Sequence, residues 1–387
     1  MSDVKHESKS VQTSGEFAEQ VSSAETAGEK AAGSQRNPSV EPTLSGVLGE
    51  AARRPLSRLG QLFAAFESLL TRQYLSVYGI AATRILLGIT GIGILATNFT
   101  ARHYVFTTGY AWSGELADPK SDFPTIWLFS LFHSLTTSPA LYTLAYLALG
   151  VLAVLITLGW RTRLVLPVYL VFWISFIETN DGAGDQGDNA YRMFLIAMLL
   201  TNSTLRWSLD ARRRRKRGVD RRQQFRSYRW ALVAAHNLAL AVLAFQVCAI
   251  YVAGGLFKAG GVAWQQGFAI YNPLQTKQFG TWPVLSDLVT AWGPGVAIVT
   301  WGSLLFQIAF PFLLFGRYTK IVALVGILGF HIGIGVLMGL PWFSLTMIAV
   351  DAIFIRSRSF KRVARSIRSF SRKLYSVNDR WPESSLR

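Results

Sequence analysis

The feature that most constrains this chain is a series of long apolar segments that begins near Tyr78 and continues to residue 356. A helix rises about 1.5 Å per residue, so about 20 apolar residues are needed to cross roughly 30 Å of hydrocarbon. Segments of suitable composition cover residues 78–97, 139–159, 163–180, 189–205, 231–257, 292–315, 320–339 and 341–356. We therefore predict an all-α polytopic membrane protein with about eight transmembrane helices.

The charges of the links between these segments predict an orientation. The links after the second, fourth and sixth segments are basic and contain RTR, ARRRRKRGVDRRQQFRSYR and GRYTK. The link after the third segment, ETNDGAGDQGDN, is acidic. Because loops rich in Lys and Arg stay on the cytoplasmic side, both termini are predicted to be cytoplasmic. The loops 98–138, 178–189 and 258–291 would then face outward.

The overall composition agrees with a membrane protein. Only 16% of the 387 residues are charged, whereas soluble domains carry about 25%. The net charge of +17 would suggest nucleic acid on a soluble fold, but here the basic residues cluster between apolar segments. We therefore expect the lipid bilayer as partner and no nucleic acid. A single cysteine, Cys248, excludes an intramolecular disulfide and is expected to pack as a small apolar residue.

Three segments flank the predicted membrane domain, which we place at residues 77–356. Residues 1–54 are rich in Ser, Glu, Lys, Gly and Ala, lack apolar periodicity, and are predicted to be a disordered cytoplasmic segment. Residues 55–76 have apolar residues at helical spacing, which predicts either an amphipathic helix on the membrane surface or an ordinary packed helix. Residues 357–387 form a basic cytoplasmic tail.

Lys258 stands at the end of the fifth apolar segment, in YVAGGLFKAGGVAWQQG. The glycines on both sides permit close approach by a ligand or by a neighbouring helix. Trp264 can wall a pocket there or anchor the membrane interface. The lysine itself has two interpretations, a cation anchored at the interface or a buried neutral amine that acts as a base.

Ionisable residues inside apolar segments are costly, and each is a functional hypothesis. Arg84 lies a turn or two inside the first segment, where it either binds an anionic group or extends to the interface. Asp188, just before the fourth segment, can point into the bundle. His331 lies near the middle of the seventh segment. It has three interpretations: a proton shuttle, a hydrogen-bond partner for a quinone, or a structural histidine. Metal-ligand spacings such as HExxH are absent, so no metal is predicted.

Three stretches together resemble a known family. They are GDNAYRMFLIAMLLTNSTLRWSLD at 187–210, QVCAIYVAGGLFKAGGVAWQQGFAI at 246–270, and FQIAFPFLLFGRYTKIVALVGILGFHIGIGVLMGLPWFSLTMI at 306–348. In order and spacing they are similar to the HTTM family, the horizontally transferred transmembrane domain related to the vitamin K-dependent gamma-carboxylase. The resemblance covers about residues 78–355.

The resemblance implies a role for Lys258. It falls where the carboxylase keeps its catalytic lysine, whose amine deprotonates a reduced quinone, and His331 would serve as a second catalytic residue. Trp264, Asp188 and Arg84 are the candidate substrate-binding residues. The carboxylase has a lysine pair at this motif, whereas Phe257 precedes the lysine here.

A further difference from the carboxylase affects the expected reaction. The carboxylase carries a large extramembrane domain after its helices, whereas this sequence continues into a short basic tail, so we do not expect propeptide-dependent glutamate carboxylation.

Two hypotheses for function follow. The first is a membrane enzyme acting at the outer face on a secreted peptide or a quinone, with Lys258 as base. The second is a non-enzymatic scaffold or maturation partner for an exported peptide, similar to sporulation-delaying protein B. Both hypotheses place the protein in a cell membrane, which we expect to be a bacterial plasma membrane.

Overall fold

The computed structural model describes residues 61, 63–107, 122–218 and 227–378. The chain divides into two units, Met1–Ala65 and Phe66–Arg387, and the description below concerns the second. The predicted disordered segment 1–54 lies outside the described residues. So do the first residues of the predicted interfacial helix 55–76 and the end of the basic tail.

Every regular element among the described residues is a helix. Five are long and apolar enough to cross a membrane: α3 (Val77–Thr97), α6 (Pro139–Leu158), α11 (Arg229–Ala259), α15 (Gly293–Leu313) and α16 (Thr319–Leu337). Two shorter apolar helices are α7 (Thr162–Ile177) and α17 (Pro341–Asp351), the latter continued by η5 (Ala352–Phe354). The prediction of a helical membrane protein is therefore confirmed.

The predicted count of about eight spans is matched only in part. The segment predicted at 189–205 is helix α8 (Gln186–Leu199), which has only 14 residues. It stops at Leu199 because the following residues, TNST at 201–204, turn away from the helix, and polar side chains of this kind bond to nearby backbone groups. Thr201 Oγ1, for example, donates to the main-chain carbonyl of Met198 at 2.9 Å.

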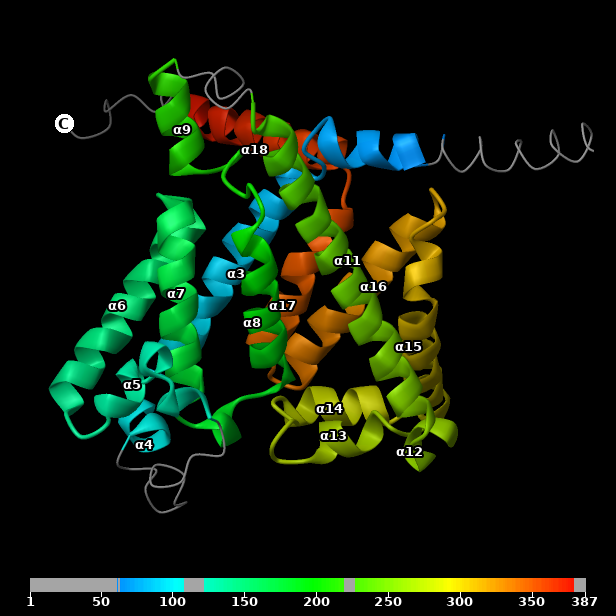
Figure 1. The fold of residues 1–387 in the computed structure, drawn as a ribbon. Coiled ribbons are helices and arrows are strands. Elements are labelled where there is room, and N and C mark those ends of the chain that lie inside the picture. The colour runs from blue at the N-terminus through cyan, green and yellow to red at the C-terminus, as the bar shows by residue number, and fades with distance from the viewer. Residues whose placement is uncertain (1–60, 62, 108–121, 219–226, 379–387) are drawn as a thin grey trace, which may run out of the picture. The chain divides into compact units, whose positions relative to one another are not determined.

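The apolar helices pack as two groups, joined by α17 and by the contact of α8 with α11 (Figure 1). In one group α3 contacts α6, α6 contacts α7, and α7 contacts α8. In the other group α11 contacts α15 and α15 contacts α16. Helix α17 touches α3 and α8 on one side and α16 and α11 on the other. Of the five long helices α3 is the most enclosed, while α6 exposes Leu144, Leu147 and Val151, as expected for a face in contact with lipid.

Short elements lie at the two ends of the bundle (Figure 1). The basic helices α9 (Leu209–Lys216) and α18 (Ser357–Asn378) lie at one end, where the rings of Trp207 and Phe360 are 5.6 Å apart. The other end holds the remaining short helices: α4 (Arg102–Phe106), η2 (Phe123–Thr125), η3 (Trp127–Phe129), α5 (Leu131–Ser134), η4 (Asp181–Ala183), α12 (Val262–Gln265), α13 (Tyr271–Gln275) and α14 (Pro283–Thr290).

The helix that precedes α3 continues to residue 71 and is fixed to α11 at its end. Asn237 Nδ2 donates to three main-chain carbonyls of residues 69–73, at 2.8 to 3.3 Å. His236 Nε2 bonds to the carbonyl of Leu75 at 2.9 Å. Phe66 and Leu69 remain exposed on this helix. An exposed apolar face next to a fixed end is what an interfacial helix requires, and its boundaries at 55–76 stay a prediction.

Candidate functional site

Lys258 lies in the last turn of α11, where a cation is favoured by the negative end of the helix dipole. Its side chain is partly buried, and Nζ donates to Oε1 of Gln307 on α15 at 2.8 Å. The amine also lies over two rings, 5.3 Å from the centroid of Trp264 and 5.5 Å from that of Phe330. Within the described part of the chain, no carboxylate pairs with it. The amine is thus held by one neutral acceptor and two aromatic faces.

Glycine at position 255 allows α11 and α15 to approach closely below Lys258. A Cβ at Gly255 would come within 2.6 Å of Ile308 Cγ1 and 3.3 Å of the Leu304 carbonyl oxygen. Gly254, the preceding residue, has more room, because a Cβ there would meet Gln307 Oε1 at 3.7 Å. The close approach brings Gln307 within reach of the amine. Gly255 therefore serves helix packing, one of the two uses predicted from sequence for the glycines around Lys258.

His331 belongs to a buried cluster with Tyr251 and Asp351, and the three come from α16, α11 and α17. The Tyr251 hydroxyl donates to Asp351 Oδ2 at 2.7 Å and lies 3.0 Å from His331 Nε2. With Asp351 ionised, the hydroxyl proton is used toward its carboxylate, so His331 Nε2 donates to the hydroxyl oxygen and Nδ1 is left as a bare acceptor. His331 is 1% exposed and Asp351 is 5% exposed.

Two atoms of this cluster are open. His331 Nδ1 and Asp351 Oδ1 are buried and have no hydrogen-bond partner among the described residues. A buried polar atom without a partner costs free energy, commonly about 1–3 kcal/mol, so it needs an explanation. A water, a proton or a substrate group at these atoms would provide one.

The amine and the buried cluster adjoin one another. Tyr251 and Lys258 are seven residues apart on α11, which is about two turns and places them on one face of the helix. Phe330, whose ring faces the amine, immediately precedes His331, and their rings are 5.2 Å apart. The structure therefore brings Lys258, Trp264 and His331 into one region, formed by α11, α12, α15, α16 and α17.

Arg84 lies elsewhere, buried between α3, the end of α6 and the segment before α9. Nη1 donates to the carbonyls of Ile156 and Thr157 at 2.5 and 2.6 Å, and Nη2 donates to the carbonyl of Trp207 at 2.5 Å. Two of these carbonyls belong to the last turn of α6, where helix carbonyls lack a full set of intrahelical donors, and the third belongs to the segment before α9. Gly159, with φ of 69°, makes room, because a Cβ there would lie 2.8 Å from Nη1. Arg84 therefore closes the end of α6, and a role in binding substrate stays a prediction.

Asp188 lies at the start of α8, where it forms a capping box with Asp185. The Asp185 carboxylate accepts from the main-chain NH of residues 187 and 188, and Asp188 Oδ2 accepts from the NH of Asp185 at 2.9 Å. Burial raises the pKa of Asp188 from 3.8 to about 6. Asp188 also lines an open pocket of about 590 Å³ with Glu178 and Arg192, which form an ion pair. It therefore lies apart from Lys258, and its role in binding substrate is untested.

The described residues contain no group of three or more His, Cys, Asp or Glu side chains placed to hold a metal ion. The buried cluster of α11, α16 and α17 supplies only one histidine and one carboxylate, together with a tyrosine. Its donors are suited to moving protons along hydrogen bonds.

Comparison with known proteins identifies the family. Residues 79–358 match the HTTM domain, which covers well over half of the chain. This chain belongs to the HTTM family. The resemblance inferred from the three sequence stretches is thereby confirmed. The HTTM domain includes every residue of the Lys258 region described above, from Tyr251 to Asp351.

A curated relative of this HTTM protein is the uncharacterized protein YitO of Bacillus subtilis (strain 168), which is 27% identical over 212 residues. The aligned part covers 52% of this chain and 63% of that protein, so the chain spans less than two thirds of its relative. No solved structure matches the chain.

Sequence reasoning missed three residues of this HTTM site. Asp351 lies within the predicted segment 341–356, so the rule that an ionisable residue in a span is a functional hypothesis would have found it. Gln307 and Tyr251 are neutral polar residues inside apolar segments, and single-sequence reading gives no reason to select them from the other polar residues there. Only the packing of α11 against α15 and α17 reveals them.

The reduced quinone implied by the family resemblance can be tested against the side chains of the HTTM site. A quinone ring is flat and carries two oxygens, so it needs apolar or aromatic walls and polar groups at its edge. Trp264 and Phe330 supply aromatic faces beside the amine. Lys258 and Gln307 supply polar groups, and the open Nδ1 of His331 supplies a buried acceptor. These residues fit such a group, and its use stays a prediction.

Proposed function

We propose that this HTTM protein is a membrane enzyme in which Lys258 acts as a base toward an apolar substrate with an acidic hydrogen, a reduced quinone or a secreted peptide. The observation that carries the proposal is the amine itself. It is partly buried between two rings, it bonds to an uncharged amide, and no described carboxylate pairs with it. Lysine is suited to such a role because, in an apolar setting, it can lose its proton.

The chemical step is a proton transfer. Neutral Lys258 uses the nitrogen lone pair to take a proton from the substrate, the amine becomes an ammonium ion, and the negative charge remains on the substrate atom. A reduced quinone, when bound, would supply an acidic O–H group at this position. Gln307 Oε1 accepts a hydrogen bond from the amine and so directs the lone pair of the neutral form away from α15.

His331 has a supporting role in this proposal. Its ring lies beside Phe330, against which the amine packs, and its Nδ1 is an open acceptor. A proton that reaches Nδ1 is stabilised through Tyr251 by the carboxylate of Asp351. The three residues therefore form a route by which Lys258 can be returned to its neutral form.

We further propose that α7, α8 and α17 complete eight membrane segments, with both termini in the cytoplasm. The basic turns gather at one end of the bundle, which supports this orientation. The turn after α6 bonds to α9 through Gly159 O and the NH of Asp210, at 3.1 Å, and α9 and α18 lie at the same end (Figure 1). Lys258 is then at the outer end of α11, in what we take to be a bacterial plasma membrane.

A second candidate is a non-enzymatic maturation partner for an exported peptide. The contacts of Lys258 with Trp264 and Gln307 would also serve a cation that only anchors the end of α11. Under this alternative the protein needs the positive charge of Lys258, and the amine never has to lose its proton. The two candidates therefore differ in what an arginine at position 258 does.

The experiment compares Lys258→Arg and Lys258→Ala in nanodiscs loaded with a naphthohydroquinone under argon. The absorbance of the hydroquinone anion is followed at a pH below the free pKa of the hydroquinone. We expect anion formation with the parent protein and none with either variant, because arginine keeps its proton. Lys277→Ala, which changes an exposed lysine after α13, is the matched control and should leave the signal unchanged.

Thermal unfolding in detergent shows whether each variant is folded. An arginine variant that is folded and forms as much anion as the parent would disprove the base and favour the anchor. A parent protein that forms no hydroquinone anion and takes no proton from an exported peptide would disprove the enzyme.

A further inference from the structure

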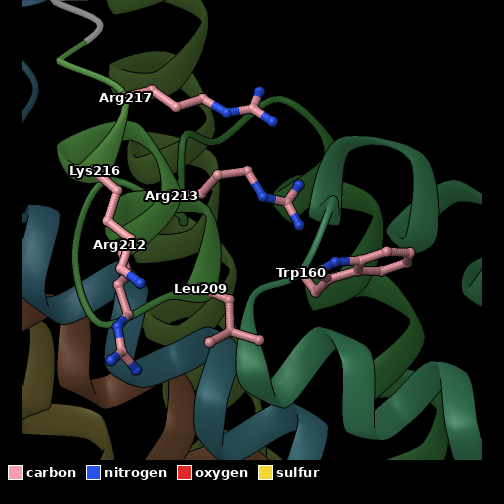
Figure 2. Close-up of a pocket in the computed structure, with 6 residues that line it drawn as sticks. All are labelled: Trp160, Leu209, Arg212, Arg213, Lys216 and Arg217. Atoms are coloured by element: carbon pink, nitrogen blue, oxygen red, sulfur yellow. The ribbon is translucent and has the colours of Figure 1, made fainter.

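We propose that the basic helix α9 and the turn between α6 and α7 form a binding site for a phosphate-bearing anion, supplied by the headgroup of an anionic phospholipid. The site is an open pocket of about 570 Å³ lined by Trp160, Leu209, Arg212, Arg213, Lys216 and Arg217. Figure 2 shows Arg213 and Arg217 extending from α9 toward the side on which Trp160 lies. This inference does not depend on the function of Lys258.

The charge of the pocket calls for an anion. Four of its six lining residues are cations and none is acidic. Cations gathered on one helix repel one another, because like charges one turn apart are destabilising. A phosphate among them removes this repulsion and accepts several charge-assisted hydrogen bonds.

The cations are held in place by the attachment of α9 to the neighbouring helices. Ser208 caps α9 by accepting from the NH of Ala211 at 2.9 Å. Asp210 accepts from the main-chain NH of Arg161 at 3.0 Å and of Thr162 at 3.4 Å. Arg214, which does not line the pocket, donates to the carbonyl of Thr204 at 2.5 Å. Asp210, the acidic residue of α9, is therefore engaged with the start of α7 and does not neutralise the pocket.

The apolar part of the pocket favours a lipid over a dissolved anion. Trp160 and Leu209 contribute to its lining, and Trp160 lies in the turn between α6 and α7, at the ends of two apolar helices. Tryptophan is enriched at the depth of the headgroups, where its ring contacts the upper acyl chains. Basic pockets at this depth on the cytoplasmic side bind anionic headgroups. A headgroup phosphate with its glycerol and acyl chains uses both parts, whereas a free phosphate uses only the cations.

The test measures lipid retained by the full-length protein in native mass spectrometry, after reconstitution with phosphatidylglycerol, with cardiolipin, or with phosphatidylcholine alone. We expect the anionic lipids to be retained and phosphatidylcholine to be lost. The variant Arg213→Gln/Arg217→Gln removes two charges from the pocket. At about 1 kcal/mol per basic residue, it should weaken retention roughly 20- to 30-fold.

The matched control is Arg358→Gln/Arg362→Gln on α18, which removes two exposed arginines at the same spacing outside the pocket. We expect it to retain the anionic lipid nearly as well as the parent protein. Equal losses in the two double variants would overturn the proposal, because they would show general attraction to a charged surface. Circular dichroism and thermal unfolding of both variants establish that they are folded.

Inorganic phosphate and pyrophosphate distinguish the sources of the anion. The lipid proposal requires that neither displaces the anionic lipid at equal phosphate concentration, and that Trp160→Ala weakens lipid retention without affecting phosphate. Displacement by free phosphate, with no effect of Trp160→Ala, would overturn the lipid as ligand. The lipid proposal would also be overturned if an RNA oligonucleotide displaced the lipid at a phosphate-group concentration below that of the lipid.

Discussion

Arg84 and Lys258 are both cations on apolar helices, and they differ in their hydrogen-bond partners and in their burial. Both terminal nitrogens of Arg84 are bonded to main-chain carbonyls, at the end of α6 and at Trp207, and its Nε has no partner among the described residues. Within the described residues Lys258 Nζ makes one hydrogen bond, to a side-chain amide, and it lies beside a cluster with two open atoms. Arg84 is 0% exposed, whereas Lys258 is only partly buried.

The difference shows how ionisable residues in a membrane protein can be sorted. An ionisable residue in a span is a functional hypothesis by default, but the rule does not distinguish a side chain that stabilises the packing of helices from a reactive group. The distinction lies in the partners. Bonds to main-chain carbonyls hold a side chain in the folded state, whereas an open acceptor beside a weakly held amine leaves room for a substrate or a proton.

The largest expected effect is on stability, from Arg84→Met. The substitution removes the donor from the carbonyls of Thr157 and Trp207, at about 1–3 kcal/mol each, while the carbonyl of Ile156 keeps the NH of Gly159. We therefore expect a loss of about 3 kcal/mol in the free energy of unfolding. Arg84→Lys should recover part of it, because one ammonium cannot reach both groups of carbonyls. Titration with a denaturing detergent, followed by circular dichroism, measures the loss. A free energy of unfolding within about 0.5 kcal/mol of the parent's would contradict this difference between Arg84 and Lys258, because Arg84 would then make no measurable contribution to stability.

Asp351→Asn tests the other region and should act on chemistry more than on stability. Asparagine keeps an oxygen that accepts from Tyr251, but it removes the carboxylate that stabilises a proton on His331. We expect proton transfer from the substrate to Lys258 to slow about 100-fold, while the free energy of unfolding changes by about 1 kcal/mol or less. Stopped-flow absorbance of the hydroquinone anion measures the rate. If Asp351→Asn instead lowers the free energy of unfolding by several kcal/mol and the folded variant keeps the parent's rate, the buried cluster is structural, as Arg84 is.

Tyr251→Phe sharpens this result. It removes the link between His331 and Asp351 and keeps both ionisable groups. A proton route through Tyr251 predicts that Tyr251→Phe and the double variant with Asp351→Asn have similar rates, because the two changes interrupt one path. If the rate reduction in the double variant equals the product of the reductions in the two single variants, the two changes act independently.

Gly255→Ala is expected to have an intermediate effect, and Gly254→Ala is its control. The Cβ at residue 255 would clash with Ile308 and with the Leu304 carbonyl. We expect this clash to lower the free energy of unfolding by about 1–2 kcal/mol and to move Gln307 away from Lys258. At residue 254 the contact is ordinary, and alanine should raise stability by up to about 1 kcal/mol. Thermal unfolding of the two variants measures the difference. Equal stabilities would mean that α11 and α15 are not in close contact there.

Sequence reasoning found the long helices and the family but not the inside of the site. Hydropathy located α3, α6, α11, α15 and α16 within a few residues, because 20 apolar residues in a row have few alternatives to a span. It placed the end of α8 too late, since the run through residue 205 includes polar residues that leave the helix. Lys258 and His331 were selected because a charge or an imidazole is rare in such segments.

The partners of these residues could not be predicted in the same way. Hydrogen bonds such as that between Lys258 and Gln307 join residues 49 apart in the chain, and nothing in a single sequence specifies the pairing. Arg84 illustrates the same limit, because all three of its acceptors are main-chain oxygens that have no signature in the sequence. The position of an ionisable residue could be predicted, whereas its set of contacts depended on the packing of the helices.

The smallest expected effect comes from Asp188, which shares features of both regions because it is bonded to the main chain and yet partly desolvated. Its pKa is about 6 in the folded protein and near 3.8 when unfolded, so between these values the folded state binds more protons. The free energy of unfolding should therefore fall as pH rises from about 4 to 6 and level off above that window. Asp188→Asn removes the titration and should flatten this slope, whereas the other half of the capping box, Asp185→Asn, should leave it in place. A slope that survives in Asp188→Asn would assign it to another group, and Asp188 would then join Arg84 as a purely structural residue.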